Sequence, residues 1–499
     1  MSLHINNLPD GILRDILDYL PLDDRKSASL VCRLWDQEVF STRLLTTVRL
    51  RVSCIMMNHK EKSLEVLQNS CRSYRNLLIS LCGSGACSDI QFAFIVDVLD
   101  KFGSTVEGFT MIRGCSSVQL RDFVTRMPNL KHLTTYVTEA DNRSTERLEF
   151  PVLTKLFDFD VEINSDDVFK RGQFAVQQMA PNVELLSLTF DKCDDPEWVF
   201  KVLKGYAGQL RSVDIFTPHN RIPIDELQFR RLQVLKLRGR AYSYGDAKLR
   251  KLFHGLPLLR EAYLDFVISR SMLEIICKNC PQLMTLDIRT ESLEERSFQC
   301  FEELTNLQVI IVNYLRLNLM EDCRPVMSVQ KFHLHTDETY LTDESYIEQF
   351  HKVFPNLQSI KVYFRGFRTK IIDQLLVRQI CRKFIHLKKL TLSGEFCLSA
   401  TIKGFELPGD LGNVKELTLI RANLCISPLS KNSVKRLKLE SLDPISFNVF
   451  RIEEVFPKLR YLEIRSCRQI TPDVITDIRR SVPDCVVHYV HMERKWVYY

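Results

Sequence analysis

The chain has 499 residues, of which 45% are hydrophobic and 26% charged, the composition of a folded protein long enough for several domains or one repeat array. Its formal net charge of +6 is small against 68 basic and 62 acidic residues, which argues against a nucleic-acid-binding protein. No run reaches the roughly 18 apolar residues of a membrane helix, and no export signal opens the chain. We therefore expect neither nucleic acid nor membrane as a partner.

The first predicted element is a helix over residues 11–20. Pro9 precedes this segment and Pro21 stops it, because proline cannot continue the helical hydrogen-bond ladder. The apolar residues recur at the spacing of one broad helical face, namely Ile12, Leu13, Ile16, Leu17 and Leu20.

A second helical segment follows Pro21. We expect Asp23 and Asp24 to cap it. Further on, Leu30 is expected to stack on Leu34, and Val31 on Trp35, as i, i+4 pairs. Such short helices cannot bury so many apolar groups among themselves, so part of this surface should be covered by something else.

The segment Leu8–Trp35, LPDGILRDILDYLPLDDRKSASLVCRLW, resembles the F-box. The family pattern contains Leu-Pro, a spaced run of Ile and Leu, a second Leu-Pro, an Asp-Arg pair and Val-Cys-x-x-Trp. Gly11 departs from it, since the family often has an acidic residue or another good helix former there.

The resemblance implies that this segment docks onto the Skp adaptor of a cullin-based ubiquitin ligase, and through it joins the cullin and RING subunits. Periodicity alone leaves another interpretation open, a helical cap that seals the end of the following domain. The residues that the resemblance assigns to adaptor binding are Leu8, Pro9, Ile12, Leu13, Ile16, Leu17, Leu20, Pro21, Leu30, Val31, Cys32 and Trp35.

After Trp35 the pattern apolar-x-x-apolar-x-apolar recurs to the end of the chain, which is the signature of leucine-rich repeats. The steps average about 26 residues. The clearest copies begin at Leu283, Leu357, Leu387, Val414, Val434 and Leu459. Others begin at Val106, Leu130, Val183, Leu210, Leu232, Leu259, Leu307 and Val329, and weaker ones at Leu45, Tyr74, Leu153 and Cys485.

Prolines support this register. Each of eight prolines stands two residues before a repeat start, where it ends a helix and holds the chain extended for a strand: Pro128, Pro151, Pro181, Pro257, Pro281, Pro355, Pro457 and Pro483. Between the strands, residues 269–280, 371–384 and 471–482 have helical apolar spacing.

The predicted fold class is therefore α/β: a leucine-rich-repeat solenoid of about 18 repeats, shaped as a horseshoe with a parallel inner sheet and outer helices, behind a small all-α F-box. The segments LDIRTESLEERSF and LEIRSCRQITPDVI resemble the cysteine-containing repeat class of F-box/leucine-rich-repeat proteins. The resemblance thus extends more loosely over the rest of the chain.

We predict an F-box domain over residues 1–41 and a solenoid over 42–499, rigidly joined, since no Gly/Ser-rich linker separates them. Residues 42–51 are expected to form the first strand. Around Leu153 the pattern places Asp158 where an apolar residue belongs, so a local register slip is expected. Residues 139–147 and 336–346 are candidate protruding loops.

The sequence contains no recognised catalytic motif, and only 17 glycines, which leaves little for phosphate-binding loops. The 16 cysteines are typical of reduced thiols in the cytosol or nucleus. Cys277-x-x-Cys280 has no second ligand pair, and Cys32 and Cys467 are expected to be packing thiols. We expect a non-catalytic protein without cofactor or metal.

The predicted functional surface of the solenoid is the concave face of the sheet, because residues that alternate with the core positions of each strand point outward. From Lys331 onward basic residues outnumber acidic ones there by six to three. The candidate target-binding residues are Lys236, Arg238, Tyr263, Arg289, Lys331, Lys361, Tyr363, Lys389, Arg436, Lys438, Tyr461 and Arg465. The alternatives are a merely solvated sheet face and a pocket for an inositol phosphate.

The leading hypothesis is a substrate receptor that holds a target protein near the ligase and so promotes its ubiquitination and degradation. An intracellular scaffold or inhibitor without a ligase role is the alternative, and an enzyme with an undetected site is the third hypothesis.

Overall fold

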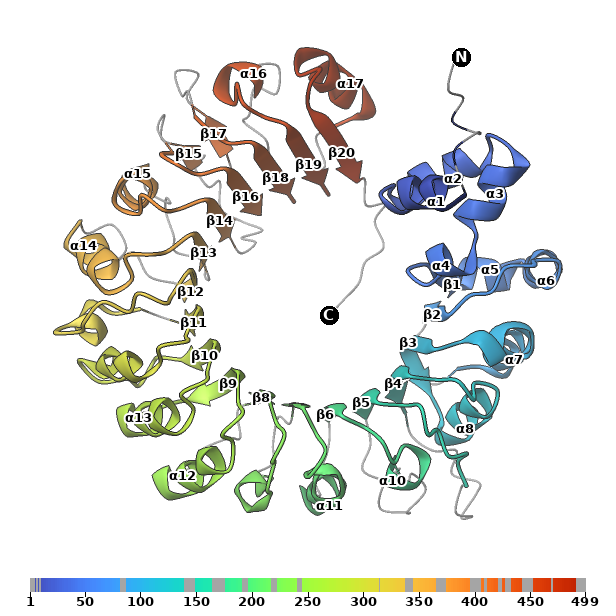
Figure 1. Cartoon of the computed structure of the whole chain (residues 1–499), viewed down its shortest axis with the longest axis horizontal. Helices are drawn as coiled ribbons and strands as arrows, with labels where there is room; N and C mark the ends of the chain where they lie inside the picture. Colours follow the sequence, from blue (N-terminus) through green and yellow to red (C-terminus); the bar gives the residue numbers. More distant parts are fainter. Residues whose placement is uncertain are drawn as a thin grey trace. The chain divides into compact units, whose positions relative to one another are not determined.

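The computed structural model describes most of the chain, in two compact units, Met1–Tyr242 and Ser243–Tyr499 (Figure 1). The described residues are 5, 8, 10–80, 87–138, 149–163, 176–190, 196–216, 222–239, 245–313, 315–336, 344–364, 374–394, 405–407, 411–420, 424–426, 432–441, 452–467 and 470–490.

The first unit opens with four short helices, α1 (Asp10–Asp18), α2 (Leu22–Ser29), α3 (Arg33–Val39) and α4 (Thr42–Leu45). The helix predicted over residues 11–20 is confirmed as α1. The prediction that Asp23 and Asp24 cap α2 is wrong, because its N-cap is Pro21 and makes no side-chain cap hydrogen bond. Both aspartates lie in the first turn, where they complement the helix dipole.

The predicted stacking of Leu30 on Leu34 and of Val31 on Trp35 is also wrong. Helix α2 ends at Ser29 and α3 begins at Arg33, so Leu30 and Val31 lie in the turn between two helices. The i, i+4 relationship holds only within one continuous helix.

The sheet of the first unit consists of parallel strands, each paired with the next along the chain. They are β1 (Arg49–Ser53), β2 (Asn76–Ser80), β3 (Gly108–Cys115), β4 (His132–Val137), β5 (Asp158–Ile163), β6 (Leu185–Phe190), β7 (Ser212–Phe216) and β8 (Val234–Arg238). The connections carry α5 (Cys54–Asn58), α6 (Lys60–Gln68), α7 (Asp89–Phe102), η2 (Gly103–Thr105), α8 (Ser117–Thr125), α10 (Val176–Met179), α11 (Pro196–Tyr206) and η3 (Ile224–Glu226).

The second unit repeats the arrangement, with parallel strands along one side and helices along the other (Figure 1). Its strands are β9 (Glu261–Val267), β10 (Thr285–Arg289), β11 (Val309–Asn313), β12 (Lys331–Thr336), β13 (Ser359–Phe364), β14 (Lys389–Gly394), β16 (Glu416–Ile420), β18 (Arg436–Glu440), β19 (Tyr461–Arg465) and β20 (Val486–Val490).

The connections of the second unit are mainly helical. They carry α12 (Asp246–His254), α13 (Arg270–Asn279), η4 (Ser297–Glu303), η5 (Leu317–Met320), α14 (Glu344–Val353), α15 (Gln374–Lys383), α16 (Ile452–Val455) and α17 (Pro472–Ser481). A separate two-stranded parallel sheet pairs β15 (Phe405–Leu407) with β17 (Leu424–Ile426). The helices predicted over 269–280 and 471–482 are confirmed as α13 and α17. The helix predicted over 371–384 corresponds to α15, and residues 371–373 lie outside the described part of the chain.

The core of each unit lies between its strands and its outer elements. In β10, Leu286 and Ile288 are buried and stand in register with Ile310 and Val312 of β11, so equivalent side chains form continuous apolar rows. A single repeat could not bury such a row alone, which is why stacking stabilises the array. The predicted class, a leucine-rich-repeat solenoid behind a helical N-terminus, is confirmed.

Three of the weaker repeat starts are displaced. In β5 the buried residues are Phe159 and Val161, so the repeat begins at Leu156 rather than Leu153. Strand β1 pairs Leu50 and Val52 with the core positions of β2, two residues beyond the register set by Leu45. In β20 the register aligns Val487 and Tyr489 with the core residues of β19, one residue off the start at Cys485.

The first strand is shorter than predicted, because residues 42–45 form α4 and the strand begins at Arg49. The predicted loop 139–147 lies outside the described residues, as does most of 336–346, although α14 already begins at Glu344. None of the helices in the described ranges has the length and apolarity needed to cross a bilayer.

Candidate functional site

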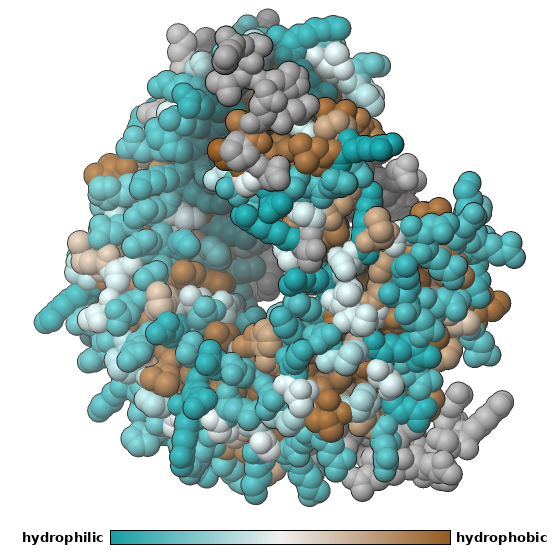
Figure 2. Space-filling model, turned by 45° about the vertical axis from the view of Figure 1, so that its right-hand side comes forward, coloured by the Kyte–Doolittle hydropathy of each residue, from teal (hydrophilic) through white to brown (hydrophobic). Residues whose placement is uncertain are grey.

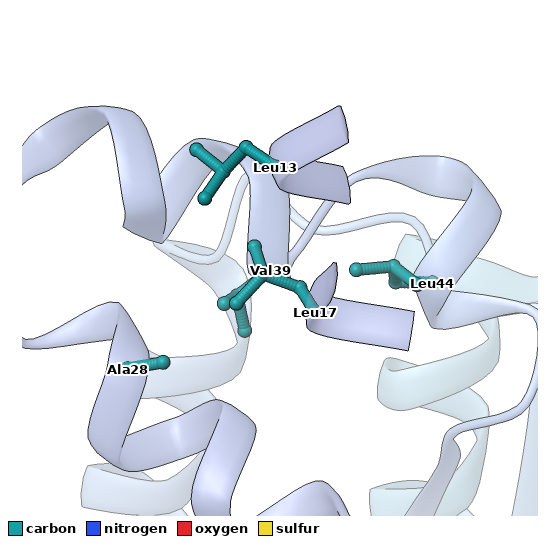
Figure 3. Close-up of a cluster of buried hydrophobic side chains, with 5 residues drawn as sticks. All are labelled: Leu13, Leu17, Ala28, Val39 and Leu44. Atoms are coloured by element: carbon teal, nitrogen blue, oxygen red, sulfur yellow. The ribbon is translucent and has the colours of Figure 1, made fainter. Parts of the chain in front are cut away.

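The N-terminal helices share a small apolar cluster (Figure 3). Leu13 and Leu17 of α1 are 1% and 0% exposed, and they pack with Ala28 of α2, Val39 of α3 and Leu44 of α4. Half-buried side chains complete the cluster from its edge: Leu20, Leu34, Trp35 and Phe40. One face of α1 is therefore used to hold the helices together.

Other apolar side chains of the same helices face solvent. Ile12 and Ile16, one turn apart on α1, are 48% and 38% exposed, and Leu30 and Val31 in the turn after α2 are 86% and 60% exposed. Tyr19 and Leu22 are exposed as well. These six side chains, all between residues 12 and 31, make up a third of the eighteen large hydrophobic side chains that are exposed in the described part of the chain.

Exposed apolar side chains are more concentrated in these helices than in the rest of the described chain. Figure 2 shows one face on which apolar side chains lie in small groups among hydrophilic ones, as is normal for a soluble protein. A concentration of exposed apolar side chains on one small domain is typical of a surface that binds another protein.

Ion pairs fix the relative positions of these helices. Arg14 of α1 contacts Glu38 of α3 through Nε at 2.6 Å and Nη2 at 3.0 Å. Arg43 of α4 lies 3.2 Å from Asp15 and 3.8 Å from Asp18, both on α1. The exposed apolar side chains of α1 are thus held on a fixed frame.

The helices are also tied to the first strands of the same unit. The Arg72 guanidinium lies 3.3 Å from the centroid of the Phe40 ring, a cation–π contact. Asn76 of β2 donates a hydrogen bond of 2.6 Å to the carbonyl oxygen of Thr46. These contacts join the N-terminal helices to β2 and to the segment before it.

The second candidate surface is the side of the sheet that faces away from the core. All twelve predicted target-binding residues alternate with buried strand positions, and each is exposed or half-buried. The structure therefore places them on the predicted side of the sheet, Lys236 and Arg238 in the first unit and the other ten in the second.

In the first unit this face carries carboxylates beside the predicted cations. Asp214 of β7 lies 2.8 Å from Arg238 and 3.9 Å from Lys236, both on β8. Burial raises the pKa of Asp160 on β5, and the nearby Asp214 adds to the effect. The two predicted cations are thus partly neutralised by the neighbouring strands.

Most of the predicted cations of the second unit are paired as well. Arg289 contacts Asp265, and Arg465 contacts Glu463. Lys438 lies 2.8 Å from Glu440, and Glu416 lies 3.3 Å from Lys389 and 3.9 Å from Arg436. The basic excess counted from sequence therefore overstates the positive charge available to a ligand.

Two of the predicted tyrosines take part in contacts of this face. Tyr263 donates a hydrogen bond of 2.9 Å to Glu261, and burial raises the pKa of its hydroxyl. The Arg436 guanidinium lies 5.4 Å from the centroid of the Tyr461 ring.

Two of the described thiols, Cys277 and Cys280, are buried near the end of α13. Cys277 is buried with its Sγ 3.4 Å from the Sγ of Cys300, and burial raises its pKa well above the ordinary value, as it raises that of Cys280 to about 12. A protonated buried thiol is a poor nucleophile and a poor metal ligand. No group of three or more metal-ligating side chains was found within the ranges that the structure describes.

The comparison with protein families addresses the N-terminal helices. Residues 5–51 match the model of the F-box-like family. The chain thus carries an F-box-like domain. Leucine-rich repeats follow it.

No curated protein matches the chain. Among solved structures it is similar to the leucine-rich-repeat protein LegL7 from Legionella pneumophila (10% identity, 68% of this chain and 97% of that chain, TM-score 0.32). It is also similar to the mouse RP105/MD-1 complex (14% identity, 81% and 84%, TM-score 0.34) and to the Rad7 and Elc1 complex in yeast (12% identity, 98% and 98%, TM-score 0.33).

Within the F-box-like domain, the residues assigned to adaptor binding divide into three groups. Ile12, Ile16, Pro21, Leu30 and Val31 are exposed, whereas Leu8, Leu20, Cys32 and Trp35 are half-buried, and Pro9 lies outside the described residues. Leu13 and Leu17 are enclosed by their own domain, so their assignment to direct partner contact is corrected to packing.

Two further exposed side chains beside the assigned residues were not predicted, Tyr19 and Leu22, which are 90% and 37% exposed. The pairing of Asp214 with Arg238 and of Glu416 with Lys389 was not predicted either. Opposite charges on successive repeats could have indicated these pairs, since the register of the parallel strands sets Glu416 beside Lys389, and Asp214 beside Lys236, two residues before Arg238.

Proposed function

We propose that this protein is the substrate-recognition subunit of a Skp–cullin–F-box ubiquitin ligase. Its F-box-like domain binds the Skp adaptor, which links it to the cullin and RING subunits. The outward face of the repeat sheet binds a target protein and presents it for ubiquitination and degradation.

The observation that carries this proposal is the separation of roles within the F-box-like domain. Leu13 and Leu17 hold the helices together, while Ile12, Leu30 and Val31 remain in water. Exposed apolar side chains have a free-energy cost that a partner removes when it covers them, at about 25 cal/mol per Å².

We assign the protein no catalytic step of its own. In this proposal it accelerates transfer by holding target lysines near the charged carrier enzyme, which raises their effective concentration. The reduced state expected for its cysteines favours the cytosol or the nucleus as its location.

The test is direct binding of the full chain to a purified Skp adaptor. Isothermal titration calorimetry then measures the adaptor affinity of variants. Leu30→Asp and Val31→Asp place a charge on exposed positions, so the fold should persist while adaptor affinity falls more than about tenfold. Ile90→Asp is the matched control, because Ile90 on α7 is 71% exposed but lies outside the F-box-like domain.

The outcomes separate the alternatives. Loss of adaptor binding in the Leu30 and Val31 variants only, together with adaptor-dependent ubiquitination of captured proteins, supports the proposal. An intact chain that does not bind any Skp adaptor would exclude the receptor function in favour of a scaffold or inhibitor. A ubiquitin thioester on a cysteine of this chain would exclude the non-catalytic assignment.

A further inference from the structure

Strands β12 and β13 carry a group of basic and aromatic side chains on the outward face of the second unit. Lys331, His333 and His335 alternate along β12 with the buried Phe332 and Leu334. The register sets His333 beside Lys361 and His335 beside Tyr363. We name these five residues (Lys331, His333, His335, Lys361 and Tyr363) the β12–β13 patch.

The patch has a definite internal geometry. The rings of His335 and Tyr363 are stacked, with centroids 4.4 Å apart and planes 14° from parallel. The ammonium group of Lys361 lies 4.8 Å from the centroid of the Tyr363 ring. This cation–π contact and the stacked pair order the centre of the patch.

The charge of the patch is not balanced by the sheet around it. None of the described residues forms an ion pair with Lys331 or Lys361, whereas five other cations of the same face do: Arg289, Lys389, Arg436, Lys438 and Arg465. The side chains in register on the flanking strands, such as Asn313 and Thr391, are neutral.

Partial burial is the main cause that lowers the pKa of His333 to about 4, and the nearby Lys361, His335 and Lys331 lower it further. The imidazole is thus neutral at pH 7, and the two lysines supply the charge.

An apolar strip borders the patch on β11. Val309 stands in register with Lys331, and Ile311 with His333, and both apolar side chains are half-exposed on the outward face. The three strands β11, β12 and β13 span about 10 Å, since neighbouring strands lie about 4.8 Å apart. That width matches three or four residues of an extended chain.

We propose that the β12–β13 patch and the β11 strip bind an extended acidic segment of a partner protein, with anionic side chains on Lys331 and Lys361 and an apolar side chain on Val309 and Ile311. The partner is the target in the receptor function proposed above, so the inference rests on that function for the identity of the partner. Carboxylate and phosphoryl groups both supply the required anion.

The test uses the full-length chain and three degenerate peptide libraries, with fixed Glu-Glu, phosphoserine or Gln-Gln beside one fixed leucine. We expect the glutamate or the phosphoserine library to be retained at least tenfold over the glutamine library, with retention falling as salt rises. Lys331→Gln and Lys361→Gln should each weaken retention about three- to tenfold, and Ile311→Ser should weaken it too.

Lys438→Gln is the matched control, because Lys438 lies on the same face but is already paired with Glu440. Equal retention of all three libraries, or the same loss with the control as with Lys331→Gln, would overturn the inference. Binding of inositol hexakisphosphate or a short single-stranded RNA through Lys331 and Lys361, without peptide retention, would also overturn it. Skp adaptor binding, measured on the same preparations, reports on the proposed function separately.

Discussion

The guanidinium of Arg14 donates two hydrogen bonds to the carboxylate of Glu38, and thereby joins α1 to α3 across 24 residues of sequence. Glu38 is only 8% exposed, so Arg14 rather than water satisfies most of its carboxylate. Through the pair, the helix that carries Ile12 and Ile16 is held against the helix that follows Leu30 and Val31.

Replacement of Arg14 by Met should destabilise the F-box-like domain by about 1–3 kcal/mol, because it leaves a buried carboxylate without its cation. The double variant Arg14→Met/Glu38→Met should recover part of that loss. Hydrogen exchange of α1 and α3 measures both effects. A double variant no more stable than the single one would show that the pair does not act as a unit.

Gly11→Ala should stabilise the domain by up to about 1 kcal/mol, since alanine has the higher helix propensity. Apart from the chain neighbours and the backbone of its own helix, no atom lies within 4 Å of a Cβ at this position, so the methyl group meets no obstacle. Gly103→Ala is the contrasting variant, because its Cβ would lie 2.5 Å from the Arg126 carbonyl oxygen. Thermal melting should show a higher melting temperature for Gly11→Ala and a lower one for Gly103→Ala.

Leu17 and Leu30 should separate stability from binding. Leu17→Ala removes a fully buried side chain and should cost about 2–5 kcal/mol of unfolding free energy. Leu30→Ala, at an 86% exposed position, should change stability by less than about 0.5 kcal/mol while weakening adaptor binding. Comparable unfolding of both variants would contradict the division of roles within the domain.

Tyr206→Phe tests a buried hydroxyl group at the end of α11, in the first compact unit. The hydroxyl of Tyr206 lies 2.8 Å from the carbonyl oxygen of Ala180 and 3.0 Å from that of Val176, and burial raises its pKa, so it stays a donor. Its removal should cost about 1–2 kcal/mol in urea-induced unfolding. Replacement of the half-buried Tyr263 by Phe should lower the free energy of unfolding by less.

His333 should make stability depend on pH. Its pKa is about 4 in the folded protein against 6.5 as the ordinary value, so between these limits the unfolded chain binds the proton that the folded chain excludes. The contribution is fully present above about pH 6.5 and is lost as the pH falls toward 4. The melting temperature of the His333→Asn variant should fall less than that of the wild type between pH 7 and pH 5. An identical fall would show that the fold does not lower the pKa of this imidazole.

The clearest repeats were predictable because buried apolar residues alternate with outward-facing residues along each strand. Leu286 and Ile288 occupy the core positions that the pattern indicates. Where the pattern was weak, as at Leu153, neighbouring strands decided the register, and Phe159 and Val161 took the core positions.

The sequence by itself determined the repeat period and the F-box-like segment, because both follow from short-range spacing of apolar residues. Only the tertiary structure decided which apolar side chains of that segment remain exposed and which cations of the sheet are neutralised. Both depend on contacts between residues some 24 positions apart, such as Arg14 with Glu38 and Arg238 with Asp214. Parallel stacking of whole repeats and packing of whole helices create those contacts, and local spacing does not encode them.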